Sequence, residues 1–335
     1  MTRTWLSALA LVLGLVPLAA AAQGTKTLEI ILFPSAGSDW PFWTEDSQGF
    51  FAKNGIAPHI TDTPGSVFQM TNLIAGKFDI GITAIDNVIA YDSGQGEAPV
   101  QGKPDLVAFV GGDNGFLRLG AVPEVKTYQD LKGKEISVDA ITTGYAFVLE
   151  KMLQKNGLKP GDYKLVAVGG TLQRFQDLLQ KGHAATLLNT PFDLLAADKG
   201  FTILGDAAPV LGHYHSSVGA TRRSWAKAHR TELVGFIRGW VAAIEWLRTP
   251  ANRAAAVALL VKHNPNIPQP MAERIAAVIL DPKTGYFPQA RFDMAGVRTV
   301  LALRQEFATP KKELGSPSRY IDLAYYKEAM KPETK

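Results

Sequence analysis

Short apolar runs alternate along the chain with segments in which an apolar residue returns at every third or fourth position. The runs are rich in branched and aromatic side chains, which is typical of buried strands. The segments between them are typical of helices that pack one face on a sheet. Strands are predicted over residues 27–33, 58–63, 78–83, 106–110, 116–122, 135–139, 164–168, 185–188 and 216–221. Helices are predicted between them over residues 41–53, 66–73, 85–91, 145–156, 172–180 and 191–199.

These elements form two series with the same β-α-β-α-β order, one beginning at residue 27 and the other at residue 135. Such a series favours an α/β fold with a mainly parallel sheet and helices on both faces. The glycine-rich stretch GGDNG separates two strands between the series, and it fits a crossing between two lobes. Beyond residue 221 the chain is predicted to be helical, over residues 232–247, 251–262, 269–279, 294–307 and 321–330.

The first 22 residues are predicted to be a cleavable signal peptide. Arg3 is followed by an apolar run over residues 5–18, and the small residues 20–22 suit signal peptidase. The run is short for a membrane span, so an uncleaved anchor is the weaker alternative. We expect the mature chain to begin near Gln23 and to be soluble, because no later segment is comparably apolar.

The chain contains no cysteine. Disulfides, thiolate metal sites and cysteine catalysis are therefore excluded, and so is a lipid anchor, which needs a cysteine at the cleavage point. An exported protein without a tether is expected in the bacterial periplasm, with secretion to the medium as the alternative.

The net charge of +4 becomes +3 without Arg3, and the basic residues are scattered. No nucleic-acid partner is expected from such a pattern. The chain has no phosphate-binding P-loop and no G-x-S-x-G elbow. His213 and His215 lack a third metal ligand. We therefore expect no metal, no cofactor and no enzymatic activity.

Ligands bind sheets of this kind beyond the carboxyl ends of the strands. Six predicted loops lie there, namely PSAGSDW, TPGS, TAIDN, AITTGY, GGTLQ and NTPFD. Several run directly into a helix, whose first N–H groups point at the loop. The candidate ligand-binding residues, in these loops and just beyond the first of them, are Ser38, Asp39, Trp40, Phe42, Trp43, Ser66, Asp86, Asn87, Thr142, Thr143, Gly144, Tyr145, Asn189 and Asp193.

The stretch GSDWPFW is predicted to be a loop. Its Trp40, Phe42 and Trp43 are candidates for an aromatic wall that stacks on a planar or apolar solute. Packing of these rings on the sheet is the alternative. Ser38 and Asp39 could bond the solute or serve as turn and capping residues.

Five further candidates lie in the other loops. One is placed as a helix cap and four follow predicted strands. Ser66 is positioned as an N-cap, and capping alone is the alternative to ligand contact. Asp86 and Asn87 could likewise bond a ligand or cap the next helix. Asn189 and Asp193 stand at the last predicted crossover of the second series.

The AITTGY loop opens a helix of the second series. Thr142, Thr143 and Gly144 offer two hydroxyls and free N–H groups, which suit an anion such as a sulfonate or carboxylate. Tyr145 is expected at the lip of the cleft, with a place in the core as the alternative.

The segment WPFWTEDSQGFFAKNGI resembles the opening of the periplasmic solute-binding proteins of ABC importers for aliphatic sulfonates, taurine and nitrate, a superfamily that includes thiamine-pyrimidine synthase-like proteins. GSVFQMTNLIAGKFDIGIT and YQDLKGKEISVDAITTGYAFVLEKMLQKNGL are similar to later landmarks of that family. GHAATLLNTPFD departs from it, since residues 183–185 replace the common acidic position. The resemblance covers nearly the whole mature chain.

The resemblance implies a two-lobe, Venus-flytrap fold in which hinge motion closes the lobes on a solute. The first lobe is expected over residues 23–112 and 216–335, and the second over residues 113–215. The implied partners are a small-molecule solute and an inner-membrane permease, with the protein a monomer. A sensing domain for a membrane receptor and an exported enzyme are the alternative functions.

The charge of the six loops bears on the solute. They contain no Arg or Lys, whereas Asp39, Asp86 and Asp193 lie in them. A neutral or partly cationic planar solute therefore fits as well as an anion or slightly better. Lys103 or Arg118 would reverse this expectation if either reached the cleft.

Overall fold

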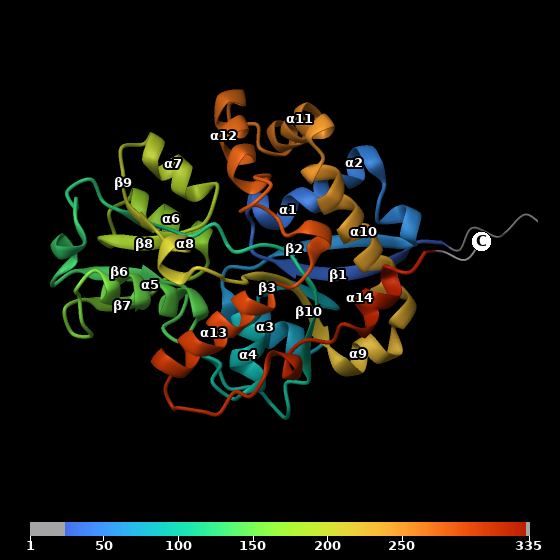
Figure 1. The fold of residues 1–335 in the computed structure, drawn as a ribbon, viewed down its shortest axis with the longest axis horizontal. Coiled ribbons are helices and arrows are strands. Elements are labelled where there is room, and N and C mark those ends of the chain that lie inside the picture. Colours follow the sequence, from blue (N-terminus) through green and yellow to red (C-terminus); the bar gives the residue numbers. More distant parts are fainter. Residues whose placement is uncertain (1–23, 333–335) are drawn as a thin grey trace, which may run out of the picture.

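The computed structural model describes residues 24–332, so the predicted signal peptide lies outside the described residues. Two five-stranded sheets lie side by side in the described part, each flanked by helices (Figure 1). The first sheet has the strand order β2-β1-β3-β10-β4, and the second has the order β7-β6-β8-β5-β9. The strands are β1 Lys26–Leu32, β2 Ile56–Asp62, β3 Ile80–Ala84, β4 Leu106–Gly111, β5 Arg118–Ala121, β6 Glu135–Val138, β7 Lys164–Ala167, β8 Ala185–Leu188, β9 Thr202–Asp206 and β10 Ser217–Arg222.

One strand is reversed in each sheet. β10 is antiparallel to both of its neighbours, and β5 is antiparallel to both of its own. The remaining pairs are parallel. The reversed strand occupies the fourth place in both orders, so the sheets share one topology, and the predicted mainly parallel, two-lobe α/β fold is confirmed.

The chain crosses between the sheets twice. β4 belongs to the first sheet and β5 to the second, so GGDNG lies in the first crossing. The chain returns between β9 and β10. The two crossings are joined, because the backbone oxygen of Asp113 accepts from the N–H groups of Ser216 and Ser217 at 2.9 and 3.3 Å.

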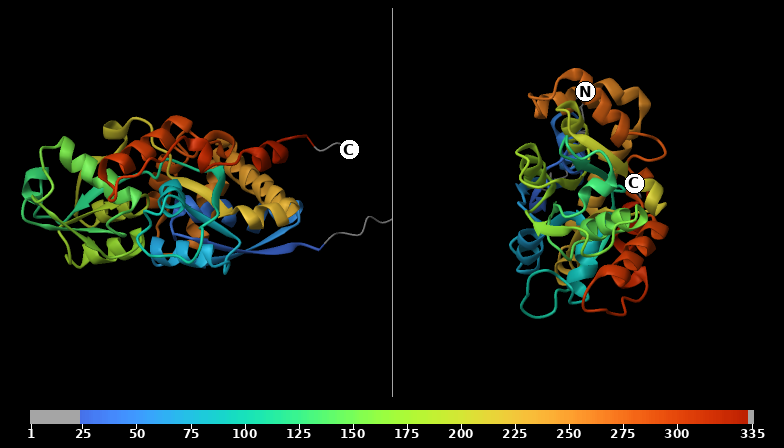
Figure 2. Two further views of the ribbon diagram at one scale, coloured as in Figure 1. Left: turned by 90° about the horizontal axis from the view of Figure 1, so that it is seen from below. Right: turned by 90° about the vertical axis from the view of Figure 1, so that its left-hand side faces the viewer.

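The helices cover the sheets and connect them. They are α1 Ala36–Trp43, α2 Glu45–Gln48, α3 Ser66–Ile74, α4 Ile85–Asp92, α5 Gly144–Lys155, α6 Thr171–Leu179, α7 Phe192–Asp198, α8 Ala208–Leu211, α9 Arg223–Ala228, α10 Arg230–Arg248, α11 Arg253–His263, α12 Gln269–Ile279, α13 Met294–Phe307 and α14 Ala324–Ala329. Figure 2 shows the C-terminal helices extending along one face of the molecule. Among them α13 packs on α4 beside the first sheet and on α5 beside the second.

The largest side chains of the first lobe meet where α1 lies against α10. Trp40 and Trp240 are fully buried, and Phe42 stacks on Phe51 with ring centroids 5.2 Å apart. Each indole N–H still has a partner, since Trp40 donates to the oxygen of Ala256 at 3.1 Å and Trp240 to that of Gly111 at 3.0 Å. These bonds remove the cost of burying the two polar groups.

The predicted helix over residues 41–53 is wrong, and so is the prediction of a loop at GSDWPFW. α1 begins earlier, with Ser35 as its N-cap, and ends at Trp43. Pro41 lies inside this helix without an N–H for the oxygen of Gly37, which instead accepts from the hydroxyl of Tyr286 at 2.9 Å. The chain then turns at Gly49, whose φ of 61° stops further helix.

Most other helix and strand boundaries lie within a few residues of those predicted from the sequence. The main element that the prediction omitted is β9. β9 is a half-exposed edge strand, so it carries little of the apolar pattern by which strands are recognised.

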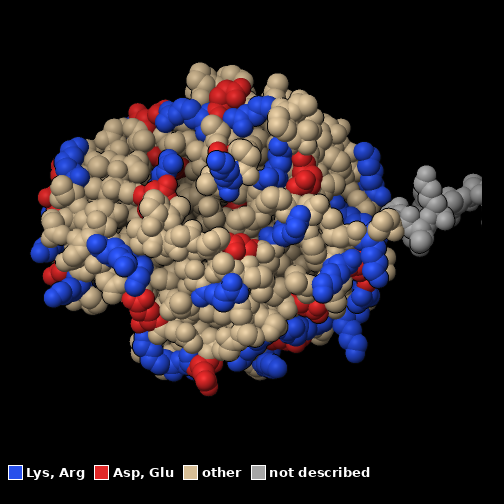
Figure 3. Space-filling model, viewed as in Figure 1, with Lys and Arg blue, Asp and Glu red and all other residues tan. Residues whose placement is uncertain are grey.

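Within residues 24–332, no helix combines the length and apolar character needed to span a membrane. Acidic and basic side chains are interspersed on the face shown in Figure 3.

Candidate functional site

A cavity lies between the two sheets, beyond the carboxyl ends of β1, β3, β6 and β8. We call it the central cavity. The first lobe lines it with Phe33, Ser35, Gly37, Ser38, Ile82, Thr83, Ala84 and Asn87. The second lobe lines it with Asp139, Thr143, Gly144, Tyr145, Gly170, Thr171, Arg174 and Asn189. The crossings add Asp113, Gly115, Phe116, Ser216 and Ser217.

The centre of a water molecule can move through about 70 Å³ of the central cavity. One water needs roughly 10–15 Å³ by this measure, so the space suits a small molecule. Because residues of both lobes and both crossings line it, a molecule held there would lie between the two lobes.

Six of the predicted ligand-binding residues line the central cavity, namely Ser38, Asn87, Thr143, Gly144, Tyr145 and Asn189. They come from four of the six predicted loops, and a fifth loop, GGTLQ, contributes Gly170 and Thr171. The loops that lie beyond the carboxyl ends of the strands therefore meet at the central cavity.

The aromatic wall predicted from GSDWPFW is wrong. Trp40 and Phe42 are buried in the first-lobe core, and Trp43 stacks on His263 with centroids 4.9 Å apart. These rings belong to α1 and pack toward α10 and α11, away from the cavity. The rings that do line the cavity are those of Phe33, Phe116 and Tyr145.

Asp86 and Asp193 do not line the cavity, and each is paired with an arginine. Both oxygens of Asp86 accept from Arg304, at 2.8 and 2.5 Å. Asp193 accepts from Arg118 at 3.1 Å, and Arg118 also lies 3.5 Å from Asp206. The expectation about solute charge rested on these two carboxylates and on Asp39, and none of the three lines the cavity.

Asp39, Ser66 and Thr142 surround the cavity without lining it. Asp39 accepts from the N–H of Ser35 at 2.8 Å, and burial raises the pKa of its carboxyl to about 7. Ser66 is the first residue of α3, whose N-cap is Gly65, so the predicted capping role of Ser66 is wrong. Thr142 bonds to Glu97 through its N–H and its hydroxyl.

Arg174 is a buried cation at the cavity that sequence reasoning missed. It lies on α6, one residue beyond the loop GGTLQ. Its Nε donates to the oxygen of Gly169 at 3.0 Å, and Nη2 donates to the hydroxyl of Thr171 at 2.8 Å. Nη1 donates to Thr186 at 2.9 Å and to the oxygen of Leu187. Burial lowers its pKa, which the nearby carboxylate of Asp139 opposes.

Two carboxyl groups at the cavity were also missed, although both stand where the rule would place them. Asp139 follows β6 directly, and Asp113 lies in the first crossing. Burial raises the pKa of Asp139, against the Ser66 hydrogen bond and the charge of Arg174. Burial raises the pKa of Asp113 to about 7, against one hydrogen bond from Gly115.

The second lobe presents the beginnings of two helices to the cavity. α5 begins at Gly144 and α6 at Thr171, and both residues line it. The first N–H groups of a helix carry partial positive charge. Gly144 fits here because a Cβ at that position would lie 2.6 Å from Cβ of Asp86 on α4.

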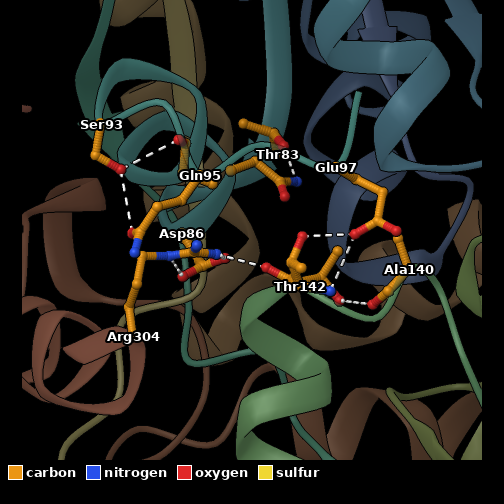
Figure 4. A network of polar contacts seen from close by, with 11 residues as sticks. Thr83, Asp86, Ser93, Gln95, Glu97, Ala140, Thr142 and Arg304 are labelled. Atoms are coloured by element: carbon orange, nitrogen blue, oxygen red, sulfur yellow. Dashed lines mark hydrogen bonds and ion pairs between the residues drawn. The ribbon is translucent and has the colours of Figure 1, made fainter. Parts of the chain in front are cut away.

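Direct bonds join the two lobes around the cavity. The N–H of Gly170 donates to the oxygen of Pro64 at 2.8 Å, and that of Ser66 to Asp139 at 3.2 Å. Figure 4 shows a second group, in which Arg304 reaches from Asp86 to the oxygen of Thr142, and Thr142 reaches Glu97. The lobes are therefore in contact on more than one side of the cavity.

No cluster of three or more His, Cys, Asp or Glu able to hold a metal occurs within residues 24–332. His213 bonds to Asp293 at 2.9 Å, and burial lowers the pKa of His215 to about 3. His215 is thus a neutral, buried ring between Phe287 and Phe292.

Solved structures of known proteins share this fold. The periplasmic nitrate-binding protein NrtA from Synechocystis PCC 6803 has a TM-score of 0.75 at 12% identity, covering 91% of this chain and 88% of that one. The alkanesulfonate-binding protein SsuA from Xanthomonas axonopodis pv. citri, bound to MOPS, has a TM-score of 0.69 at 15% identity, covering 90% and 99%. A ligand-binding component of an ABC-type import system from Staphylococcus aureus has a TM-score of 0.71 at 13% identity, covering 91% and 99%. At these identities the likeness establishes the two-lobe fold of periplasmic binding proteins.

No curated protein sequence matches the chain. A family match nevertheless spans more than half of it, over residues 39–252, to the family described as NMT1/THI5 like. This stretch contains both crossings and every second-lobe residue of the central cavity. The resemblance noted in the sequence is thereby confirmed, and the chain belongs to the NMT1/THI5-like family.

Proposed function

We propose that this protein binds a small organic solute in the central cavity, in the periplasm, and delivers it to the permease of an ABC importer. The observation that carries the proposal is the cavity itself, which is lined from both lobes and both crossings. A solute that contacts both lobes favours the conformation in which the lobes are closed. A permease can then distinguish the solute-bound protein from the empty one.

The division into lobes is part of this proposal. Residues 23–112 and 216–335 form the first lobe and residues 113–215 the second, with the two crossings as the hinge. The sheet membership of β4, β5, β9 and β10 supports these limits. The bonds from Ser216 and Ser217 to Asp113 support a hinge made of two joined crossings.

Filling the cavity tests the binding role. Ser38 lines the cavity on α1, so Ser38→Trp should occupy the solute's place and abolish binding. The matched control is Ser47→Trp on the exposed α2, which should bind as the wild type does. Binding is measured as the rise in melting temperature of the mature, ligand-stripped protein across a panel of small metabolites.

A solute at about 100 times its Kd adds roughly 2.7 kcal/mol to the stability, a shift of a few degrees. A hit that shifts both variants equally would place the solute outside the central cavity. Circular dichroism establishes that Ser38→Trp is folded.

Transport is tested in the organism. Deleting the gene should reduce uptake of the labelled solute, and a plasmid copy of Ser47→Trp, but not of Ser38→Trp, should restore it. Unchanged uptake together with a lost transcriptional response to the solute would instead indicate a sensing role.

A further inference from the structure

A carboxyl oxygen at the wall of the cavity is not engaged by any described residue. Asp113 is 4% exposed, and its Oδ1 accepts from the N–H of Gly115 at 2.7 Å. Its Oδ2 accepts no hydrogen bond from any described residue. A Cβ placed on Gly37, which lines the cavity, would lie 3.9 Å from this oxygen. Oδ2 of Asp113 therefore stands at the cavity wall as an unused acceptor.

A second buried side chain offers another acceptor. Asn87 is 5% exposed and lines the cavity. Its Nδ2 donates to the hydroxyl of Thr83 at 2.9 Å, which fixes the orientation of the amide. The amide oxygen is left without a donor among the described residues. Two side chains that are more than nine-tenths buried thus present to the cavity oxygens that no described residue engages.

The charged donor of the cavity, Arg174, is largely engaged within the protein. Four of the five N–H groups of Arg174 are used on Gly169, Thr171, Thr186 and Leu187. The hydroxyl of Thr143 donates to the oxygen of Ala140 at 2.9 Å.

Above about pH 7, where the carboxyl of Asp113 ionises, an anion made only of acceptors would therefore meet a negative charge, with little of the arginine free to balance it. Its remaining attractions would be the helix beginnings of the second lobe and the neutral donors of Ser38, Asn189 and Ser217. Those helix ends can equally hold the acceptor end of a molecule whose other end donates.

We propose that the solute carries at least one N–H donor, as an amine, amidine, amide or amino-substituted ring, and that this group bonds to Oδ2 of Asp113. The proposal rests on the solute-binding function proposed above and specifies its chemical class. Solutes that contain only acceptors, such as nitrate and simple alkanesulfonates, are not ligands of this cavity.

The test begins with a thermal-shift panel of small metabolites divided into N–H donors and acceptor-only anions, with nitrate and alkanesulfonates included. Hits confined to N–H donors are expected. Hits confined to acceptor-only anions would overturn the assignment and leave the solute-binding function intact. The absence of any hit in either class would overturn both.

Calorimetry then locates the donor of the best hit. Asp113→Asn should raise its Kd at least tenfold, whereas Asp322→Asn, which removes an exposed carboxylate at the start of α14, should leave it unchanged. An unchanged Kd in Asp113→Asn would overturn the assignment of this residue.

A matched ligand keeps the test independent of how the variant folds. The analogue of the hit with its N–H replaced by N–CH₃ should bind the wild type at least tenfold more weakly. The same replacement should change the Kd of Asp113→Asn by less than threefold. Equal losses in both proteins would show that the N–H group bonds elsewhere.

Discussion

Asp113 carries a cost in the unliganded protein, because burial opposes its charge. The pKa of its carboxyl is about 7 in the fold against an ordinary value of 3.8. The unfolded chain ionises above the ordinary value while the folded protein keeps the proton until about pH 7. The stability contributed by this group is therefore full at low pH and is lost as the pH rises toward 7.

Asp113→Asn should consequently raise the stability of the unliganded protein at pH 8, by about 2–4 kcal/mol, and the gain should vanish near pH 4. Melting temperatures across this pH range measure it. Part of the wild-type pH dependence should remain in the variant, because burial raises the pKa of Asp39 to about 7 as well. A variant less stable than the wild type at pH 8 would contradict this account of Asp113.

The identity of the polar residues at the cavity was predictable only in part. Thr143, Gly144 and Asn87 follow strands and start helices, so the loop rule finds them. Arg174 is the fourth residue of α6 and lies one residue beyond the loop that the rule selects. The aromatic residues of GSDWPFW misled the prediction, because apolar side chains near a strand end serve the core as readily as a ligand.

At the scale of elements, α13 joins the lobes through a buried ion pair. The side chains of Arg304 on α13 and Asp86 on α4 are fully buried. The guanidinium of Arg304 also lies 5.0 Å from the ring centre of Phe147 on α5. The same guanidinium donates to the oxygen of Thr142 at 2.8 Å. Three helices from both sides of the cavity therefore depend on one side chain.

Replacing Arg304 alone should destabilise the protein strongly. Arg304→Met leaves the carboxylate of Asp86 buried without its partner, at an expected cost of about 3–5 kcal/mol. The double variant Asp86→Leu with Arg304→Met should recover much of that loss, since it buries no unpaired charge. Urea unfolding of the three proteins measures both effects, and equal losses in the single and double variants would count against the ion pair as the cause.

Strongly periodic elements were well predicted, whereas the ends and edges were not. α12 and α13 match their predicted ranges because their apolar faces are continuous. β9 was missed because an edge strand needs little apolar pattern, and the start of α1 was missed because its cap, Ser35, precedes a proline-containing stretch. The order of the predicted elements still sufficed to predict two sheets, since β-α-β units have few alternative arrangements.

For the whole molecule, the contacts around the cavity bear on how readily the lobes close. Glu97 extends from the first lobe to the N–H and hydroxyl of Thr142 in the second, at 3.1 and 2.6 Å. This contact is exposed, so it contributes at most about 1 kcal/mol. It acts only when the lobes meet, and its loss should lower the population of the closed form.

Glu97→Ala should accordingly weaken solute binding by about twofold to fivefold, through the closed population alone. The comparison is Glu135→Ala, which removes an exposed pair with Lys164 between neighbouring strands of one sheet and should leave the affinity unchanged. Calorimetric Kd values report the difference. An equal change in the two variants would mean that the Thr142 contact plays no part in closure.

The N–H groups of Ser216 and Ser217, which bond to the backbone oxygen of Asp113, make the proposed hinge accessible to hydrogen-exchange measurements. The residue proposed to receive the solute through its side chain also holds the second crossing through its main chain. A solute that immobilises Asp113 should thus slow the exchange of these two amide hydrogens with deuterated solvent, while the amides of the distant, exposed β7 edge exchange as before. The exchange rates of the Ser216 and Ser217 amides would then report how long the solute stays bound.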